Sequence, residues 1–267
     1  MKIQAAIDSV GRQFGDDQVE ELLRAARRGF NQAFDLIRRP QAALGVVKSP
    51  LGDLLVAASS RGVVLNHYVR DGADLAATIG RLRLYFDPVD DRSTAEEIGQ
   101  EVRGYLAGDA KALRHKVDLT LAQSEFQKMV LAKLRAVPRG AVLSYRALSA
   151  VTGSPNAARA VGNALHNNPV PVYVPCHRVI AHDGGIGGYG GGLPSKLQLL
   201  RAEGFTVDNT GARISDHTVW GNKGTRIYCR PQCRTTARVD RTHVLFFADS
   251  KQAQRAGMRP CKLCRPS

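Results

Sequence analysis

The chain is short of several residue types, and each shortage narrows what the protein can be. Its 267 residues include one tryptophan, three methionines and five cysteines, and aromatic residues make up only 6%. No apolar stretch approaches the ~20 residues that are needed to cross a bilayer, which argues against a membrane-spanning protein. Acidic residues are outnumbered, with 24 of them against 38 lysines and arginines, so the net charge is +14.

This basic excess favours a partner that is rich in phosphate, because Lys and Arg side chains that neutralise phosphates release counterions from nucleic acid. A basic excess that serves only solubility is the alternative. The charge is uneven, since residues 221–267 hold eleven basic and two acidic residues and therefore +9 of the net charge. The C-terminal segment is thus a candidate nucleic-acid contact.

The cysteine content and the N-terminus bear on location. An odd number of cysteines argues against a disulfide framework. The N-terminal segment MKIQAAIDSVGRQFGDD has charges within its apolar part and no cleavage pattern of small residues, so it does not resemble a secretory signal. We therefore expect a cytoplasmic protein with reduced cysteines.

With 43% hydrophobic and 23% charged residues, the chain has the composition of a globular protein with one large domain or two ordinary ones. Apolar residues at three- and four-residue steps predict an amphipathic helix over residues 17–38, which Pro40 ends. Residues 43–69 contain three short apolar runs separated by turn signals. This pattern predicts an antiparallel meander.

Four helices are predicted in the middle of the chain. One covers Thr94–Ala107, with Ser93 as its N-cap, and one follows Ser124. Two short helices, over residues 145–153 and 156–168, are joined by a tight Gly-Ser-Pro turn. This spacing suits a helix-turn-helix, although other helical corners share it.

Cys176 stands apart from the other four cysteines and is directly followed by His177. A nucleophilic cysteine needs a base to take its proton, a group that orients the base, and a cation or helix N-terminus nearby. Neighbouring side chains in an extended chain point in opposite directions, so contact within this pair requires a turn or a bridging water. Taken alone, the pair also fits an inert cysteine in the core.

The residues around this pair resemble the O6-alkylguanine-DNA alkyltransferase family, over roughly residues 43–204. The family's Pro-Cys-His-Arg-Val signature is present as residues 175–179, and its Asn-Pro-Val-Pro as residues 168–171. The family's helix-turn-helix and downstream residues match, in order, at Ser144, Tyr145, Ala158, Arg159, Ala160, Val161, Gly162, Tyr189, Lys196, Glu203 and Gly204.

The resemblance implies a suicidal DNA repair enzyme. It moves an alkyl group from O6-alkylguanine in double-stranded DNA to its own cysteine, with O4-alkylthymine as a further substrate class. Cys176 would be the acceptor, His177 would polarise it through a water, and Glu203 would orient His177. Asn168 would lock the turn beneath the cysteine, and Tyr145 would help to rotate the nucleotide out and protonate the departing guanine.

The same resemblance implies the DNA contacts. Arg159 would fill the space of the extruded base, and backbone groups of Cys176 and Val179 would recognise its edge. The other expected contacts are Tyr145, Ala158 and Arg178.

These residue types suit attack on a saturated alkyl carbon. Such a carbon offers no carbonyl to polarise, so the protein must supply a thiolate and a better leaving group. A serine would serve poorly, because its alkoxide is far harder to generate. A stacked base must be flipped out before it can react. Because no cellular reductant reverses a thioether, each molecule should act once.

The chain departs from the family in two places. Gly188 and Gly190 stand where relatives often carry a polar side chain, so backbone donors survive but side-chain hydrogen bonds to the guanine do not. Our hypothesis is a roomier pocket, which a comparison of transfer from O6-methyl and O6-benzyl substrates tests; a strict preference for methyl would count against it. The second departure is the helix before Pro40, which the core family does not require.

The other four cysteines form two close pairs, Cys229-X3-Cys233 and Cys261-X2-Cys264. Four thiolates in such pairs predict a tetrahedral Zn²⁺ site, and a tail with few apolar side chains needs such a site to fold. A disulfide is the less favoured alternative in a reducing compartment. We expect removal of zinc to unfold the tail and lower DNA affinity while base repair continues.

Residues 217–267 also resemble the metal-binding domain of the bacterial adaptive-response protein Ada. That resemblance implies a zinc-bound acceptor of methyl groups from DNA phosphotriesters, at Cys229 by motif position, whose methylation makes the protein a transcription activator. Activation is the less favoured role, because the chain has no second helix-turn-helix like that of Ada. The alternative is a structural zinc knuckle that grips phosphates through Arg226, Arg230, Arg234 and Arg259.

The expected fold class is α+β, in a monomer. The predicted order is a helical extension (1–40), a small ribonuclease H-like α/β subdomain (41–120), a helical winged-helix catalytic domain (121–205), a linker (206–216) and a four-cysteine zinc module (217–267). Two other functions stay open. One is a non-catalytic sensor of alkyl lesions, which Cys176 disfavours, and the other is a zinc-dependent DNA-binding regulator.

Overall fold

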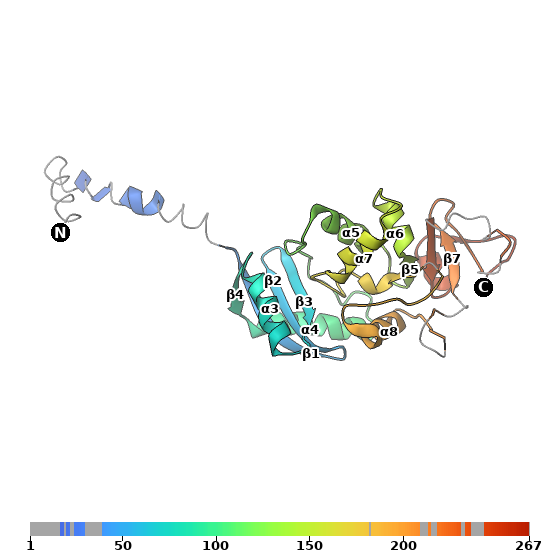
Figure 1. Cartoon of the computed structure of the whole chain (residues 1–267), viewed down its shortest axis with the longest axis horizontal. Coiled ribbons are helices and arrows are strands. Elements are labelled where there is room, and N and C mark those ends of the chain that lie inside the picture. The colour runs from blue at the N-terminus through green and yellow to red at the C-terminus, as the bar shows by residue number, and fades with distance from the viewer. Residues whose placement is uncertain are drawn as a thin grey trace. The chain divides into compact units, whose positions relative to one another are not determined.

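The computed structural model describes residues 17–18, 20–21, 24–29, 39–181, 183–208, 213–214, 218–230, 233–235 and 243–266. The chain divides into two units, Met1–Pro40 and Gln41–Ser267 (Figure 1). In the first unit the described residues between 17 and 29 are helical, as predicted, and the rest of the helix expected over 17–38 lies outside the described residues. No described helix is long and apolar enough to cross a membrane.

The second unit has a mixed α and β fold that begins with a four-stranded sheet. β1 (Gln41–Ser49), β2 (Gly52–Ser59) and β3 (Gly62–Tyr68) pair antiparallel in chain order, which confirms the predicted meander. The two turns need glycine, because Gly52 and Gly62 have φ angles of +100° and +134°. β4 (Asp87–Asp90), which was not predicted, pairs in parallel with β1.

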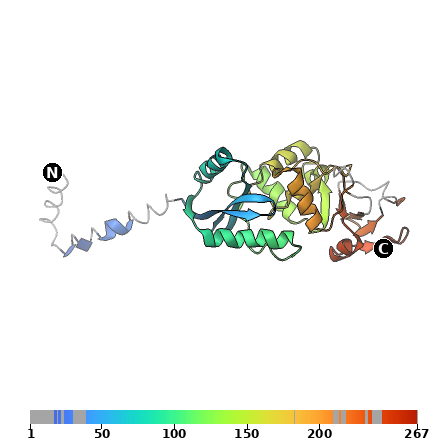
Figure 2. The same ribbon diagram turned by 90° about the horizontal axis from the view of Figure 1, so that it is seen from below.

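Two helices cover opposite faces of this sheet (Figure 2). α3 (Gly72–Leu82) packs on the face that carries Leu55, and α4 (Arg92–Leu106) packs on the face that carries Leu54 and Val56. This division follows from the alternation of side chains along a strand. The four strands are therefore enclosed between two helical layers.

α4 begins earlier than predicted. Ser93 was expected as its N-cap, but the side chain of Asp91 accepts the hydrogen bond from the backbone N–H of Thr94 at 3.0 Å, so the helix starts at Arg92. The buried side of the helix ends with Tyr105, one residue before the helix itself ends. Tyr105 therefore points into the protein where α4 approaches the rest of the unit.

Helices dominate the middle of the chain. The first of them follows Ser124, as predicted, and Ser124 is its N-cap, because its side chain accepts from the Gln127 backbone N–H at 3.1 Å. The two short helices predicted around a Gly-Ser-Pro turn are present, and Gly153 has a φ of +74° in that turn. The elements are α5 (Glu125–Arg135), β5 (Ala141–Ser144), α6 (Tyr145–Val151), α7 (Ala158–His166), the 3-10 turn η1 (Cys176–Arg178), β6 (Val179–Ile180) and α8 (Gly192–Ala202).

The C-terminal segment extends a second sheet, whose strand order is β10-β8-β7-β9-β5-β6. β9 pairs antiparallel with β5, with Ala141 opposite Phe247 and Val142 opposite Phe246. The sheet is thus continuous from the middle of the chain into its last part. The elements of that part are β7 (Val219–Asn222), β8 (Ile227–Cys229), β9 (Val244–Phe247), α9 (Ser250–Arg255) and β10 (Arg259–Pro260).

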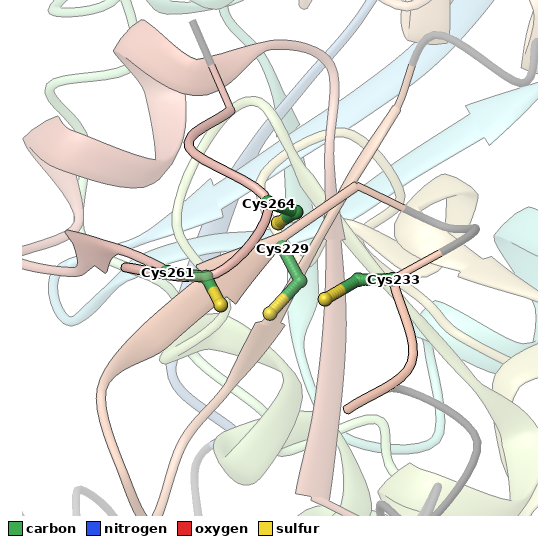
Figure 3. Close-up of side chains that lie close together, drawn as sticks. All are labelled: Cys229, Cys233, Cys261 and Cys264. Carbon is green, nitrogen blue, oxygen red and sulfur yellow. The ribbon is translucent and has the colours of Figure 1, made fainter.

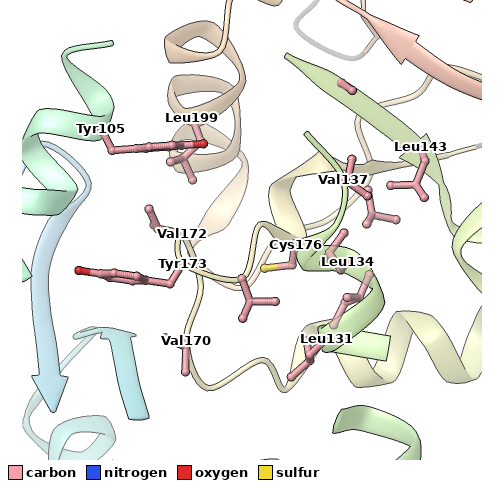
Figure 4. Close-up of a cluster of buried hydrophobic side chains, with 14 of the residues drawn as sticks. Tyr105, Leu131, Leu134, Val137, Leu143, Val170, Val172, Tyr173, Cys176 and Leu199 are labelled. Atoms are coloured by element: carbon pink, nitrogen blue, oxygen red, sulfur yellow. The ribbon is translucent and has the colours of Figure 1, made fainter. Parts of the chain in front are cut away.

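One hydrophobic core joins the C-terminal segment to the middle of the chain. Tyr228 and Phe247 are fully buried in the same cluster as Leu143. Figure 4 shows part of this cluster, with Cys176 and Tyr105 among its side chains. The C-terminal segment therefore packs against the region that carries Cys176.

The linker expected over residues 206–216 is described only at 206–208 and 213–214. Val207 and Ile214 form an antiparallel bridge, and Arg213 forms another with Gly185. The described part of this segment therefore contacts the glycine-rich loop that follows Cys176.

Candidate functional site

Cys176 opens the turn η1, and its side chain is buried. Its Sγ lies 3.2 Å from Nδ2 of Asn168, which also donates to the Val174 carbonyl at 3.0 Å. Oδ1 of Asn168 accepts from the Val170 backbone N–H at 3.0 Å. Asn168 therefore closes the loop beneath the sulfur with three hydrogen bonds.

His177 and Glu203 form a buried pair next to this cysteine. Nε2 of His177 lies 2.6 Å from Oε1 of Glu203, and both side chains are 0% exposed. We assign the ring proton to Nε2, because only a protonated nitrogen can donate to the carboxylate. Nδ1 is then an acceptor, and it has no hydrogen-bond partner among the described residues. Burial lowers the pKa of His177, so the imidazole is neutral and can take a proton.

Glu203 is surrounded by donors. Nε of Arg178 lies 3.0 Å from both carboxylate oxygens, the Gly140 backbone N–H donates to Oε2 at 3.0 Å, and the Tyr105 hydroxyl donates to Oε1. Burial alone would raise the pKa of this carboxyl, but the hydrogen bond from His177, the charge of Arg178 and the hydrogen bond from the Tyr105 hydroxyl lower it to about 2. Glu203 is therefore ionised at physiological pH.

Arg178, which was expected to contact DNA, is placed differently. Its side chain is buried, and Nε, Nη1 and Nη2 donate to Glu203, to the Val137 carbonyl and to the Tyr105 hydroxyl. A buried charge is costly without a partner of opposite sign. The ion pair therefore stabilises both the Arg178 guanidinium and the Glu203 carboxylate in the interior. Arg178 thus faces the protein interior and not a phosphate.

Burial raises the pKa of the Cys176 thiol, and the hydrogen bond from Asn168 and the charge of Lys196 only partly offset this effect. The resting sulfur is therefore a thiol, whereas the chemistry of the reaction calls for a thiolate. A thiol in this state can act as a nucleophile only if a neighbouring group takes its proton.

Lys196 places a positive charge near the sulfur. Its buried Nζ donates to the carbonyls of Val179, Ile186 and Gly188, at 2.7, 2.6 and 3.2 Å. Burial lowers the pKa of Lys196 to about 8, so most of it is still protonated near neutral pH. This side chain also ties the glycine-rich loop to the strand that follows Cys176.

Two cavities meet at Cys176. One, of about 140 Å³, is lined by Tyr145 and Gly188, and the other, of about 70 Å³, is lined by Tyr68. Tyr189 borders both, and its hydroxyl lies 2.8 Å from that of Tyr68. The structure therefore brings Tyr145 and Cys176 to the same cavity.

The corner of α6 and α7 presents an arginine at its surface. Arg159, the second residue of α7, is exposed and forms no ion pair within the described part of the chain, and Ala158 before it is half-buried. One turn further, a Cβ on Gly162 would lie 3.9 Å from Cε1 of Tyr145. The helix that carries Arg159 thus lies directly against the ring that lines the cavity.

The remaining four cysteines converge at one place (Figure 3). Cys229 ends β8 and Cys261 follows β10, and the parallel pairing of these strands brings them together with Cys233 and Cys264. All four sulfur atoms lie within 4.8 Å of one another. Tetrahedral thiolates about 2.3 Å from Zn²⁺ would be about 3.8 Å apart. The Thr235 hydroxyl lies 3.3 and 3.1 Å from the sulfurs of Cys229 and Cys233, where it can donate a hydrogen bond to a thiolate and so help to orient it. This donor set fits a structural zinc site.

The pH dependence of stability tests the state of Glu203. Its carboxyl has a pKa of about 2 in the folded protein and an ordinary value of 4.5. It therefore stabilises the fold above pH 4.5 and loses this effect as the pH falls toward 2. The difference in free energy of unfolding between wild type and Glu203→Gln should shrink by about 1 kcal/mol from about pH 6 to about pH 3.5. Denaturant titrations at both pH values measure it, and a constant difference would contradict the assignment.

Two contributors to the site were not predicted, Tyr105 and the backbone of Gly140. A signal existed for Tyr105, because it falls on the apolar stripe of a helix and a buried tyrosine hydroxyl needs a hydrogen-bond partner. The sequence contains no such signal for Gly140, whose role depends on where the chain turns after α5.

These features define a class of protein. The structure combines a buried cysteine beside a histidine–glutamate pair, a helical corner with an exposed arginine, and a four-thiolate zinc site. This combination is typical of a DNA-binding protein in which a cysteine side chain reacts with the substrate.

Comparison with known proteins names the family. Residues 125–205 match the model of "6-O-methylguanine DNA methyltransferase, DNA binding domain", and residues 206–267 match that of the "Metal binding domain of Ada". The methylated-DNA–protein-cysteine methyltransferase of Mycobacterium leprae is 37% identical over 159 residues, which cover 60% of this chain and 90% of that protein. The chain belongs to the methylated-DNA–protein-cysteine methyltransferase family and carries an Ada-type zinc module.

Two further comparisons show the extent of the likeness. The human protein of the same name is 46% identical over 101 residues, 38% of this chain, and the match spans about half of that protein, 47% of its length. A solved variant of the Mycobacterium tuberculosis O6-methylguanine methyltransferase is 28% identical, with a TM-score of 0.50, and covers 64% of this chain and 98% of its own.

Proposed function

We propose that this protein repairs DNA by moving a methyl or larger alkyl group from O6 of guanine to Cys176 in a single turnover, with O4-alkylthymine as a further substrate class. The observation that carries the proposal is the neutral, buried His177, paired with Glu203 at 2.6 Å, next to a cysteine that lines a cavity. Family membership supports the same reaction.

In the proposed step, Sγ of Cys176 attacks the alkyl carbon, and the S–C bond forms as the bond from carbon to O6 breaks. His177 takes the thiol proton at Nδ1 through a water, and Tyr145 gives a proton to the departing guanine. Burial raises the pKa of Tyr145, which keeps its hydroxyl protonated as the donor. The step leaves His177 protonated and Tyr145 deprotonated, and proton exchange with water then restores both side chains, so no further reactant is needed.

The proposed partner is double-stranded DNA that contains O6-alkylguanine. The start of α7 would enter a groove, with Arg159 in the space of the flipped base and Ala158 close to the backbone. Backbone groups of Cys176 and Val179 would bind the edge of the base. Arg178 is left out of this surface, because its guanidinium is engaged by Glu203.

Mass spectrometry of the protein after incubation with O6-methylguanine duplex tests the proposal. A gain of one CH₂ on the peptide that holds Cys176 is expected, with none after incubation with unmodified duplex. DNA binding without any adduct would favour the two alternatives, a lesion sensor or a zinc-dependent regulator.

Arg159→Ala should slow repair of duplex DNA by roughly tenfold or more, because flipping a base costs a few kcal/mol unless a side chain fills the gap. Transfer from free O6-benzylguanine, which needs no flipping, should be unchanged. Arg146→Ala is the matched control, since it removes another exposed positive charge, from α6. Equal duplex rates in wild type and Arg159→Ala would refute the wedge assignment.

A second candidate reaction concerns Cys229. This residue lines a cavity of about 180 Å³ together with Trp220 and Cys261. If the zinc-bound thiolate of Cys229 accepts methyl groups from methylphosphotriester DNA, this cavity would provide room for the methyl group. A purely structural zinc site would not need such a cavity. The mass-spectrometric assay with methylphosphotriester DNA distinguishes them by an adduct on Cys229.

The proposal includes an organisation and a location. The sheet with α3 and α4 falls within the ribonuclease H-like subdomain proposed for 41–120, and α5 to α8 fall within the winged-helix domain proposed for 121–205. The linker (206–216) and zinc module (217–267) follow, after an extension over 1–40. We propose a monomer in the reducing cytoplasm, because the chemistry uses free thiols.

A further inference from the structure

We propose that Tyr105 is a positioning residue for the alkyl transfer, which holds the His177–Glu203 pair in its reactive arrangement from the neighbouring subdomain. Tyr105 belongs to α4, the helix that covers the first sheet, whereas His177 and Glu203 belong to the region around α8. The inference rests on the proposed function and adds a residue that neither the sequence motif nor the family resemblance assigned.

The hydroxyl of Tyr105 sits at the junction of the catalytic side chains. It donates to Oε1 of Glu203, accepts from Nη2 of Arg178 at 3.2 Å, and lies 3.4 Å from Nε2 of His177. Oε1 is the same oxygen that accepts from His177. Tyr105 therefore shares the acceptor that fixes the imidazole.

The ring of Tyr105 is held in place by its surroundings. The residue is 2% exposed, and the Arg139 guanidinium carbon lies 5.0 Å above the ring centroid. Nη1 of Arg139 donates to the Gly108 carbonyl at 2.9 Å, and Nη2 donates to the Ala202 carbonyl. Arg139 thus links the end of α4 to the end of α8 through these hydrogen bonds. Its guanidinium also holds the tyrosine ring by a cation–π interaction.

The hydroxyl is a donor at every working pH. Burial and then the charge of Glu203 raise the pKa of Tyr105, so it stays protonated. A donor to Oε1 makes the carboxylate less basic, so the proton between Glu203 and His177 stays on Nε2. Nδ1 is then free to receive the proton from Cys176.

Other charged groups also affect the pKa of His177, and a substitution of Tyr105 leaves them in place. Glu203 raises its pKa, while Arg178 and Lys196 lower it. The titratable and charged groups that face the pair are Tyr105 from α4, Arg139 from the loop after α5, Cys176 and Arg178 from η1, Lys196 from α8, and Tyr189 from the glycine-rich loop.

Tyr105→Phe in the full-length, zinc-loaded protein tests the proposal through single-turnover transfer rates over a range of pH. The loss of the donor makes Glu203 more basic and raises the proton affinity of His177, so the acid limb of the rate–pH profile should move up by about one pH unit. The rate on the plateau should fall roughly tenfold, because the imidazole is less well fixed. The adduct should still form on Cys176 at long times.

Tyr173→Phe is the matched control. The Tyr173 hydroxyl is also buried and donates to a carboxylate, Oε2 of Glu101 on α4, at 2.8 Å, but it does not contact the catalytic pair. It should lower stability to a similar degree and leave the acid limb where it is. Tyr105→3-fluorotyrosine keeps the hydroxyl and makes it a stronger donor, so the acid limb should move to lower pH.

The outcomes separate this inference from the proposed function. Wild-type protein that forms no adduct on Cys176 would overturn both. Normal transfer by wild type, with an acid limb that is the same in Tyr105→Phe and Tyr173→Phe, would overturn the role of Tyr105 alone. If Tyr105→Phe does not fold, an unshifted profile for the fluorotyrosine variant would overturn it equally.

Discussion

Cys176→Ala is expected to reduce alkyl transfer by on the order of 10⁴-fold or more, to below detection, because the nucleophile is lost and no other thiol borders the two cavities within the described residues. The variant should still fold. The change removes one sulfur from the core, at about 1 kcal/mol, and Asn168 keeps its hydrogen bond to the Val174 carbonyl. Binding to O6-methylguanine duplex should persist, since the change leaves α7, the helix proposed to contact DNA, untouched.

The measurement pairs a transfer assay with a binding assay at the same salt concentration. Cys176→Ser is the matched control, because it keeps a polar atom near Asn168 but replaces the thiol by a hydroxyl that ionises far less readily. Both variants should bind the lesion and neither should carry an adduct. Transfer by Cys176→Ala at a rate near that of wild type would remove Cys176 from the mechanism.

Removal of zinc is expected to destabilise the catalytic region as well as the C-terminal segment, in contrast to the expectation from sequence that base repair would continue. β9 is hydrogen-bonded to β5, the strand that leads directly into Tyr145. The Ala248 N–H donates to the Gly140 carbonyl at 3.1 Å, and the Gly140 N–H donates to Glu203. Loss of the module would expose the edge of β5 and part of the shared core.

The expected effect is large, because a structural zinc site contributes several kcal/mol to folding. Chelation, or Cys261→Ser, should lower Tm by roughly 10 °C or more and lower the transfer rate and the hydrogen-exchange protection of β5. Leu263→Ala is the control, since this exposed side chain lies between two ligands without binding the metal. Full transfer activity and unchanged protection of β5 without zinc would show that the module is independent of the catalytic region.

Zinc release would then have two separable effects. The basic residues of the C-terminal segment would affect salt-dependent DNA affinity, whereas the β5–β9 pairing would affect the rate of the chemical step. Transfer from free O6-benzylguanine, which bypasses the duplex, reports the second effect alone.

The sequence by itself determined the local features of this protein. The antiparallel meander, the presence of α5 to α7 with the apolar face of α5, and the pairing of four cysteines follow from residues that lie a few positions apart. Turn residues, helical periodicity and ligand spacing act over that range. The chemistry proposed for Cys176 and His177 was likewise predicted from residues that are adjacent in the sequence.

Only the tertiary structure decided which distant groups meet. Tyr105 and Glu203 are 98 residues apart in the chain, and their contact depends on how α4 packs against α8. Arg178 reads as a DNA contact in the motif, yet it faces inward because the buried carboxylate of Glu203 lies on that side. The pairing of β9 with β5 likewise depends on which strand edge is open after folding. Such contacts leave no periodic pattern, because they are selected by shape and by the need to pair buried charges and backbone groups.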